Sequence, residues 1–202
     1  VNLQTGEVLL VLERLYGLRL DTFRESQRPS ADTASCIMQG VCRALMYLHS
    51  RSPCIVHCDL KPSNILVEVP QRPKLLDFGL SHALTRQVKH TGGTSHYMAP
   101  EVLRSNRLKP SPGNDVFSLG RLLYFVASGR KPLGHLKPMQ IRTMAFDGKV
   151  PDLDWLPKTE LLVMWKPIIR DCISQDLAMR PTVKEVLEQL ALFHPFEEYM
   201  FK

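Results

Sequence analysis

Two carboxylates, one amide and one ammonium group in the sequence have the types and spacing that phosphate chemistry uses. Asp59 is followed two residues later by Lys61 and five residues later by Asn64, and Asp77 comes 18 residues after Asp59. Carboxylate and amide oxygens are hard ligands that suit Mg²⁺, and a lysine ammonium can offset negative charge on a phosphate. Each residue alone is a weak signal, because a single Asp in a loop is usually a solvated turn residue or a helix cap.

The four residues belong to the first two of three short motifs that follow one another along the chain. The motifs are His57-Cys-Asp-Leu-Lys-Pro-Ser-Asn64, Asp77-Phe-Gly79 and Ala99-Pro-Glu101. A three-residue string such as Asp-Phe-Gly occurs by chance, but all three motifs in this order form a specific pattern. The pattern resembles the catalytic loop, the metal-binding loop and the end of the activation segment of eukaryotic protein kinases.

The resemblance implies a role for each group in phosphoryl transfer. Asp59 would accept the hydroxyl proton of a protein substrate, and Lys61 would approach the γ-phosphate of ATP. Asn64 and Asp77 would bind Mg²⁺ beside the ATP phosphates. Thr94, just before the third motif, resembles the residue that hydrogen-bonds the catalytic Asp and Lys. ATP and Mg²⁺ are therefore the expected cofactors, and a protein is the expected substrate.

The residues before the motifs are expected to contact the adenine of ATP. The apolar run 8–12 indicates a buried strand, which in the kinase pattern is the last strand of the small lobe and leads into the hinge. By this resemblance Leu12 lies behind the adenine, and the backbone of Glu13 and Leu15 faces its edge. Leu66 forms the floor below it. Ordinary core packing is the alternative role for the three leucines.

Three further charged residues resemble structural charges of the kinase large lobe. Asp115 resembles the buried aspartate that holds the backbone of the catalytic loop, and Arg180 resembles the ion-pair partner of Glu101. A buried carboxylate and a buried guanidinium must be paired, because either one alone in the interior is unfavourable. We expect these three residues to be structural.

The spacing of apolar residues predicts a mainly helical fold. The predicted elements are a helix over 31–50, strands over 65–67 and 74–76 around a turn with Pro70 and Pro73, and a helix over 182–193. Either Ser30 or Asp32 can cap the first of these helices. The resemblance implies the large helical lobe of the protein-kinase-like fold, with short β-hairpins and with the small β lobe almost entirely absent.

The small lobe of a kinase is expected to be largely missing from this sequence. Kinases carry a glycine-rich loop and a strand lysine that contacts the ATP phosphates, and neither motif precedes residue 8. We therefore expect residues 1–17 to form the last small-lobe strand and the hinge, and residues 18–202 to form the large lobe. Such a fragment should bind ATP poorly, so the activity is assigned to the intact protein.

The composition argues against several other classes of protein. The chain has 202 residues and a net charge of +6, but its Lys and Arg are scattered and form no nucleic-acid motif. It contains no apolar run long enough to span a bilayer and no signal-peptide pattern at its start. Five cysteines, an odd number, indicate reduced thiols in a cytoplasmic protein. A zinc site at Cys54, His57 and Cys58 is disfavoured, because no second ligand pair follows at zinc-like spacing.

The favoured interpretation is a protein serine/threonine kinase. The lysine two residues after the catalytic aspartate, together with Thr94, fits the Ser/Thr type better than the tyrosine type. Cys58 stands where many kinases have an arginine that binds a phosphate on the activation segment, so phosphorylation of that segment should matter less here. A pseudokinase scaffold and a truncated interaction module are the alternatives, and the intact polar site residues argue against the scaffold. The sequence indicates neither an oligomeric state nor a particular substrate.

Overall fold

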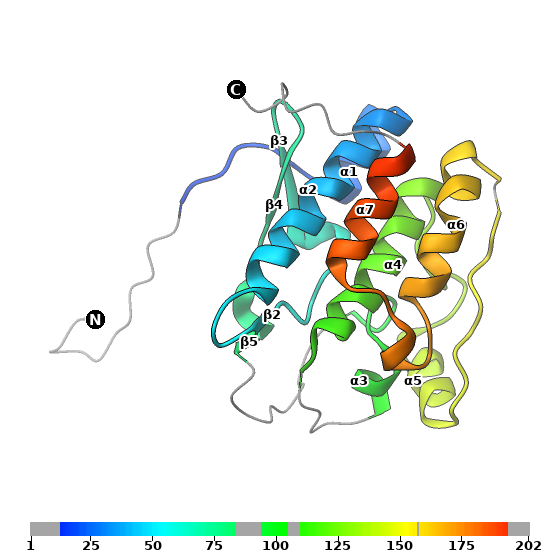
Figure 1. The fold of residues 1–202 in the computed structure, drawn as a ribbon. Coiled ribbons are helices and arrows are strands. Elements are labelled where there is room, and N and C mark those ends of the chain that lie inside the picture. Colours follow the sequence, from blue (N-terminus) through cyan, green and yellow to red (C-terminus); the bar gives the residue numbers. More distant parts are fainter. Residues whose placement is uncertain (1–12, 84–93, 105–109, 157, 194–202) are drawn as a thin grey trace, which may run out of the picture.

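The computed structural model describes residues 13–83, 94–104, 110–156 and 158–193, which form a helical body with two small β-sheets beside it (Figure 1). The helices are α1 (Leu20–Gln27), α2 (Ala31–His49), α3 (Pro100–Arg104), α4 (Pro112–Ser128), α5 (Pro138–Phe146), α6 (Glu160–Cys172) and α7 (Val183–Phe193). The strands are β1 (Leu18–Arg19), β2 (Ile55–Val56), β3 (Ile65–Glu68), β4 (Arg72–Leu75) and β5 (His82–Ala83). The strand expected at residues 8–12, with Leu12, lies outside the described residues.

Helix α2 forms where the apolar spacing predicts it. Ser30 is the residue that caps its start, because the Ser30 hydroxyl accepts a hydrogen bond from the Thr33 backbone amide at 3.2 Å. Ile37, Val41 and Leu45 are each at most 1% exposed, so the predicted apolar face is the buried face. This face packs against α4, and α2 also packs along α7 (Figure 1).

Helix α4 runs through the centre of the described body, and all of its residues from Asn114 to Ser128 are buried. It packs closely against α6, and Gly120 permits this approach. A Cβ atom added at Gly120 would lie 2.6 Å from the Cβ atom of Cys172 on α6. The start of α4 is fixed by the Asn114 side chain, whose Oδ1 accepts a hydrogen bond from the Ser111 backbone amide at 2.8 Å.

The larger sheet has the strand order β1-β3-β4 with antiparallel pairing, and β2 pairs with β5 in the other sheet. Leu66 on the central strand lies opposite Arg19 on one side and Lys74 on the other. The expectation that Pro73 lies in the turn is wrong, since it lies in β4 opposite Val67. Proline is tolerated there because β4 is an edge strand of the described sheet and can lack a backbone donor.

These elements confirm a mainly helical lobe with short strands, including the β3–β4 hairpin. The last predicted helix, over 182–193, corresponds to α7. Within the part of the chain that the structure describes, no helix is long and apolar enough to cross a membrane.

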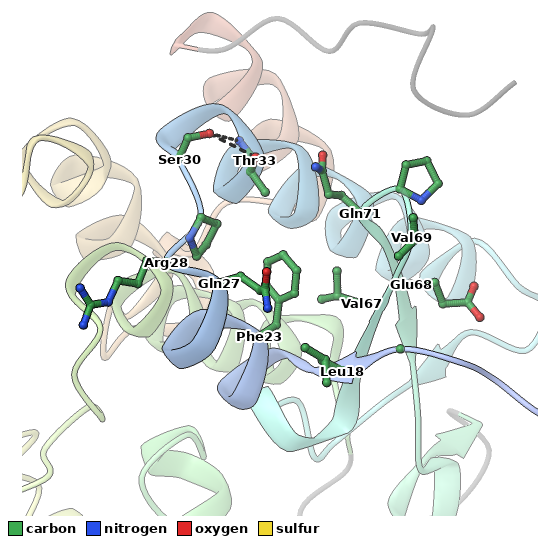
Figure 2. A pocket seen from close by; sticks show the side chains of 13 residues that line it. Leu18, Phe23, Gln27, Arg28, Ser30, Thr33, Val67, Glu68, Val69 and Gln71 are labelled. Carbon is green, nitrogen blue, oxygen red and sulfur yellow. Dashed lines mark hydrogen bonds between the residues drawn. The ribbon is translucent and has the colours of Figure 1, made fainter.

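A groove of about 620 Å³ opens between α1, the start of α2 and the turn that joins β3 to β4 (Figure 2). Leu18, Phe23 and Val67 contribute apolar side chains to it. The motif residues of the sequence do not line this groove.

Candidate active site

The backbone of the catalytic loop is held by one carboxylate from α4. Asp115 is fully buried, and its two oxygens accept hydrogen bonds from the backbone amides of His57 at 2.8 Å and Cys58 at 2.9 Å. The Nε2 atom of His49, at the end of α2, lies 2.9 Å from the same carboxylate. Cys58 has a positive φ of 67°, so the loop turns sharply just before Asp59. The predicted structural role of Asp115 is therefore confirmed.

Asp59, Lys61 and Asn64 meet in one polar cluster. The Nζ atom of Lys61 donates to Asp59 Oδ2 at 2.6 Å, and the Nδ2 atom of Asn64 donates to the same oxygen at 3.0 Å. Asn64 Nδ2 also donates to the Asp59 backbone carbonyl at 2.9 Å. Asp59 is only 8% exposed, so its carboxylate has a fixed direction. Three of the predicted site residues are thus brought into direct contact.

Asp77 is joined to this cluster through the backbone rather than through its side chain. The Leu76 amide donates to the Asn64 carbonyl at 2.8 Å, and a ring nitrogen of His57 lies 3.1 Å from the Leu76 carbonyl. The His57 and Phe78 rings are 5.3 Å apart between centroids. These contacts fix the residues on both sides of Asp77. The loop before it and the loop after it therefore form one packed unit.

The side chain of Asp77 is exposed and makes few hydrogen bonds. Its Oδ1 atom accepts one hydrogen bond, from the Gly79 backbone amide at 3.2 Å, and the residue has a left-handed φ of 59°. Asn64 uses its amide nitrogen on Asp59, which leaves its carboxamide oxygen as the atom available to a cation. Among the described residues, no group of three or more His, Cys, Asp or Glu side chains is arranged so that it could hold a metal ion. One carboxylate and one amide oxygen fit Mg²⁺, which uses few protein ligands and keeps several waters.

Among the residues expected beside adenine, Leu66 lies on the central strand of the larger sheet, and Glu13 contacts the neighbouring edge strand β4. Leu66 is half-buried in the centre of β3, opposite Lys74. The Nζ atom of Lys74 is 3.2 Å from the Glu13 carboxylate, which brings the segment with Glu13 and Leu15 toward this part of the sheet. Leu15 is half-buried. Leu12 lies outside the described residues.

Thr94 is not hydrogen-bonded to the catalytic loop in this structure. Its backbone carbonyl accepts a hydrogen bond from the Tyr97 amide at 2.8 Å, which starts the turn before α3. Its hydroxyl makes no hydrogen bond with Asp59 or Lys61, both of which the structure describes. The resemblance assigned that bond to Thr94, and the cluster instead closes on Asn64.

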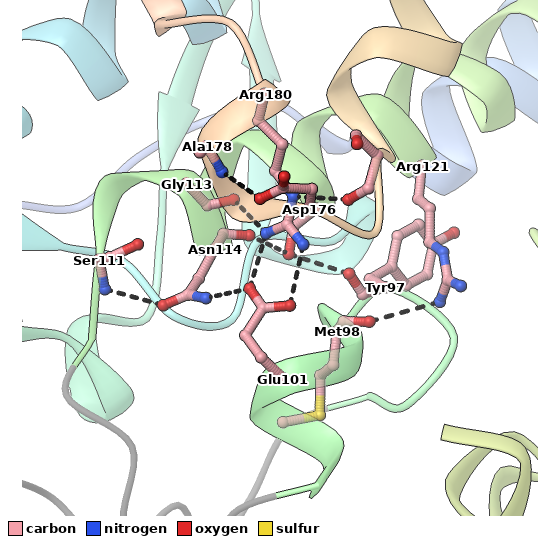
Figure 3. A network of polar contacts seen from close by, with 12 residues as sticks. Tyr97, Met98, Glu101, Ser111, Gly113, Asn114, Arg121, Asp176, Ala178 and Arg180 are labelled. Carbon is pink, nitrogen blue, oxygen red and sulfur yellow. Dashed lines mark hydrogen bonds and ion pairs between the residues drawn. The ribbon is translucent and has the colours of Figure 1, made fainter. Parts of the chain in front are cut away.

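Glu101 and Arg180 form the ion pair that the resemblance implies (Figure 3). The two guanidinium nitrogens of Arg180 lie 2.6 and 2.8 Å from the two carboxylate oxygens of Glu101. The Arg180 side chain is 0% exposed, whereas that of Glu101 is 20% exposed, so only the cation is fully buried. Asn114 adds a hydrogen bond to Glu101 at 2.6 Å. The pair ties α3 to the segment that precedes α7.

Arg121, in the middle of α4, is a second buried guanidinium. Its Nη1 atom donates to the His96 carbonyl at 2.9 Å and lies 3.4 and 3.5 Å from the carbonyls of Ser95 and Met98. Among the described residues its Nε atom has no hydrogen-bond partner, and no carboxylate forms an ion pair with it. Burial lowers the pKa of Arg121 to about 9. The Arg121 side chain therefore fixes the segment between Thr94 and α3 through the backbone carbonyls of that segment.

Sequence reasoning missed His49, Asn114 and Arg121. His49 is the last residue of a correctly predicted helix, and Asn114 directly precedes Asp115, so neither has a signal of its own. Arg121 did carry one, because it is a single charge inside the apolar run of α4. A buried charge in such a run needs partners, which the sequence alone does not identify.

Comparison with known proteins agrees with the motifs and with the helical lobe. The family model described as the protein kinase domain matches residues 1–192. The chain is 34% identical over 165 residues to the serine/threonine-protein kinase AfsK of Streptomyces coelicolor, covering 80% of this chain and 19% of that protein. It is 31% identical over 199 residues to mitogen-activated protein kinase kinase 2 of Arabidopsis thaliana, covering 95% of this chain and 53% of that protein. With the serine/threonine-protein kinase CTR1 of Arabidopsis thaliana it shares 36% identity over 154 residues, which is 74% of this chain and 18% of that protein.

The chain belongs to the protein kinase family, since the family model covers nearly its whole length. Two of these three relatives, AfsK and CTR1, are named serine/threonine-protein kinases, which matches the type that the catalytic loop favours. The chain spans only part of the length of these relatives.

Proposed function

We propose that this chain is the large lobe of a protein serine/threonine kinase, and that the intact protein transfers the γ-phosphate of ATP to a serine or threonine hydroxyl of a protein substrate. The observation that carries the proposal is the cluster at Asp59, where one carboxylate oxygen lies 2.6 Å from the Lys61 ammonium and 3.0 Å from the Asn64 amide. A carboxylate fixed in this way can orient a hydroxyl for in-line attack on phosphorus.

Residues of two loops are proposed to take part in this step, one loop with Asp59, Lys61 and Asn64 and the other with Asp77. Asp59 orients the substrate hydroxyl and accepts its proton while the new oxygen–phosphorus bond forms and the bond to the leaving ADP oxygen breaks. Lys61 lies close enough to Asp59 to contact the transferred phosphate as well. Mg²⁺, when bound, would neutralise phosphate charge, and Asn64 and Asp77 are the residues that would hold it.

The nucleotide is proposed to lie between these loops and the central strand of the larger sheet. Leu66 forms the floor below adenine, the backbone of Glu13 and Leu15 contacts its edge, and Leu12 closes its back. Residues 1–17 then act as the last small-lobe strand and hinge, and residues 18–202 act as the large lobe. Thr94 is proposed to contact Asp59 when a substrate is bound. We also expect a cytoplasmic site of action, where the five cysteines, none of which forms a disulfide here, stay reduced.

The test is Asp59→Asn in the intact kinase. Loss of the group that orients the hydroxyl should lower kcat by a few orders of magnitude, about 3–6 kcal/mol of barrier, while the melting temperature and nucleotide binding change little. The control is Ser63→Ala, a change in the same loop at a side chain outside the polar cluster. Near-normal turnover in Asp59→Asn would remove Asp59 from the mechanism.

Asp77→Ala separates metal binding from folding. Because Asp77 is proposed to act through Mg²⁺, this change should weaken Mg²⁺-ATP binding at least tenfold and leave binding of metal-free adenosine nearly unchanged. Calorimetry with both ligands measures the difference. An equal loss for both ligands would indicate a structural role, and normal nucleotide binding without any turnover in the unaltered protein would favour the scaffold alternative.

Cys58 is proposed to make this kinase less sensitive to phosphate on the activation segment. Its side chain faces a very small cavity beside Met98 and Val102, and its Sγ atom lies 3.6 Å from the Val56 carbonyl. A thiol cannot form the charge-assisted bonds by which a guanidinium binds phosphate. Phosphatase treatment should therefore change the activity less than twofold, and a large drop would show that other residues bind such a phosphate.

A further inference from the structure

The groove between α1, the start of α2 and the β3–β4 turn offers an apolar surface to solvent (Figure 2). Val69, in the turn, is 93% exposed, and Leu18, on β1, is 38% exposed. Val67 forms part of the floor, and its neighbour Leu66 points to the opposite face of β3 because side chains alternate along a strand. The groove and the proposed adenine site therefore use opposite faces of the same strand.

The end of α7 lies beside one wall of this groove. In Figures 1 and 2 the C-terminal end of α7 is next to the N-terminal end of α2, where Ser30 and Thr33 line the groove. Two apolar side chains in the last turn of α7 face solvent, since Leu192 is 82% exposed and Phe193 is 40% exposed. Exposed apolar side chains are therefore present both at the groove and in the last turn of α7.

The sequence continues after Phe193 with nine residues rich in large apolar side chains. Residues 194–202 read His-Pro-Phe-Glu-Glu-Tyr-Met-Phe-Lys, with Phe196, Tyr199, Met200 and Phe201 among them. Nine residues in an extended conformation reach about 30 Å, the diameter of a small domain. Burial of such side chains against an apolar surface is favourable, and the groove lies beside the start of α2, next to the end of α7 (Figures 1 and 2).

We propose that the groove binds residues 194–202 of the same chain. Within the part of the chain that the structure describes, one polar atom of a residue that lines the groove lacks a hydrogen-bond partner. The Oε1 atom of Gln71 is buried and has no hydrogen-bond partner among the described residues, so it can accept a backbone amide of the segment. Docking would connect the end of α7 to the β3–β4 hairpin, whose central strand carries Leu66. The proposal depends on the groove and the segment alone, and it stands whether or not the chain transfers phosphate.

The first test is a disulfide trap in the full chain. Val69→Cys is combined with Tyr199→Cys, and in parallel chains with Phe196→Cys or Phe201→Cys, so that the register of the segment need not be assumed. The matched control replaces Val69→Cys by Val163→Cys, because Val163 is an exposed valine on α6, away from the groove. Mild oxidation followed by mass analysis of peptides measures how fast the two introduced thiols join within one chain.

We expect at least one groove pair to join at least tenfold faster than its control. The five native cysteines are present in every variant, so their background reactions cancel in the comparison. Equal rates for groove and control pairs overturn the proposal. A dominant disulfide-linked dimer, whose yield rises with protein concentration, also overturns it, because the segment would then occupy the groove of a second copy.

The second test uses a fluorescent peptide of sequence 194–202. In a full chain with Phe196→Ser and Phe201→Ser, the chain's own segment binds weakly and leaves the groove open. The peptide should bind this variant at least tenfold tighter than it binds the unaltered chain. Adding Val69→Asp should abolish the binding, whereas adding Val163→Asp should not. Failure of the peptide to bind the serine variant, or equal loss with both aspartates, contradicts the proposal.

Discussion

Arg180 and Arg121 are two buried guanidiniums that contact the same aromatic ring but have different partners. They lie 4.9 and 4.6 Å from the centroid of the Phe117 ring. Arg180 meets a carboxylate, that of Glu101, through two short bonds, whereas Arg121 meets backbone carbonyls only. A buried cation without a counter-charge is unfavourable, which agrees with the lowered pKa of Arg121. One arginine therefore contributes an ion pair between distant segments, and the other fixes the course of a single loop.

The largest expected effect comes from removing the counter-charge of Arg180. Glu101→Ala removes the carboxylate that pairs with Arg180, whose side chain is 0% exposed. We expect the free energy of unfolding to fall by about 3–5 kcal/mol. Denaturation by urea measures this. Glu101→Gln, which keeps the shape and one acceptor oxygen, serves as the control and should lose less. An unchanged stability in Glu101→Ala would mean that the pair does not contribute to folding.

A smaller effect is expected when the unpaired cation is removed. Arg121→Met takes a charge out of the interior, which is favourable, but it leaves the His96 carbonyl without its 2.9 Å donor, which costs about 1–3 kcal/mol. The two terms oppose each other, so the free energy of unfolding should change by less than half as much as in Glu101→Ala. The same denaturation experiment gives both values. A larger loss in Arg121→Met than in Glu101→Ala would reverse the comparison between the two arginines.

The smallest expected effect is a pH dependence at His96, the residue whose carbonyl Arg121 binds. Burial lowers the pKa of the His96 side chain from its ordinary value of 6.5, and the positive charges of Lys131 and Arg121 lower it further. Below pH 6.5 the unfolded chain therefore binds a proton that the folded chain does not. The stability contributed by neutral His96 is fully present above pH 6.5 and is lost as the pH falls below it.

The measurement is the melting temperature between pH 5 and pH 7.5. His96→Gln, which does not titrate, should show a shallower loss at acidic pH than the unaltered protein. Arg121→Met should also show a shallower loss, because the His96 pKa rises when a neighbouring positive charge is removed. If His96→Gln keeps the full slope, other groups are responsible for the acid sensitivity.

The sequence predicted the residues that belong to motifs and to periodic helices. Helix α2 follows from apolar spacing and the Glu101–Arg180 pair from the kinase resemblance, whereas the sequence left the helix cap open between Ser30 and Asp32. Arg121 could not be placed, because its partners are backbone carbonyls whose position depends on the path of the chain. The site residues were predicted by the same motifs, yet the sequence could not show that Asn64 rather than Thr94 would bind the Asp59 side chain.

The hydrogen bonds to the Asp115 carboxylate should control how fast two loop amides exchange their protons with solvent. His57 and Cys58 lie in the loop that contains Asp59, yet their backbone amides donate to the side chain of Asp115, in the first turn of the buried helix α4. Solvent can take these two protons only when α4 parts from the loop, which is an opening of the core rather than a local fluctuation. Amide hydrogen exchange at His57 and Cys58 should therefore be as slow as in the centre of α4, and Asp115→Asn should make both amides exchange early while the middle of the helix remains protected.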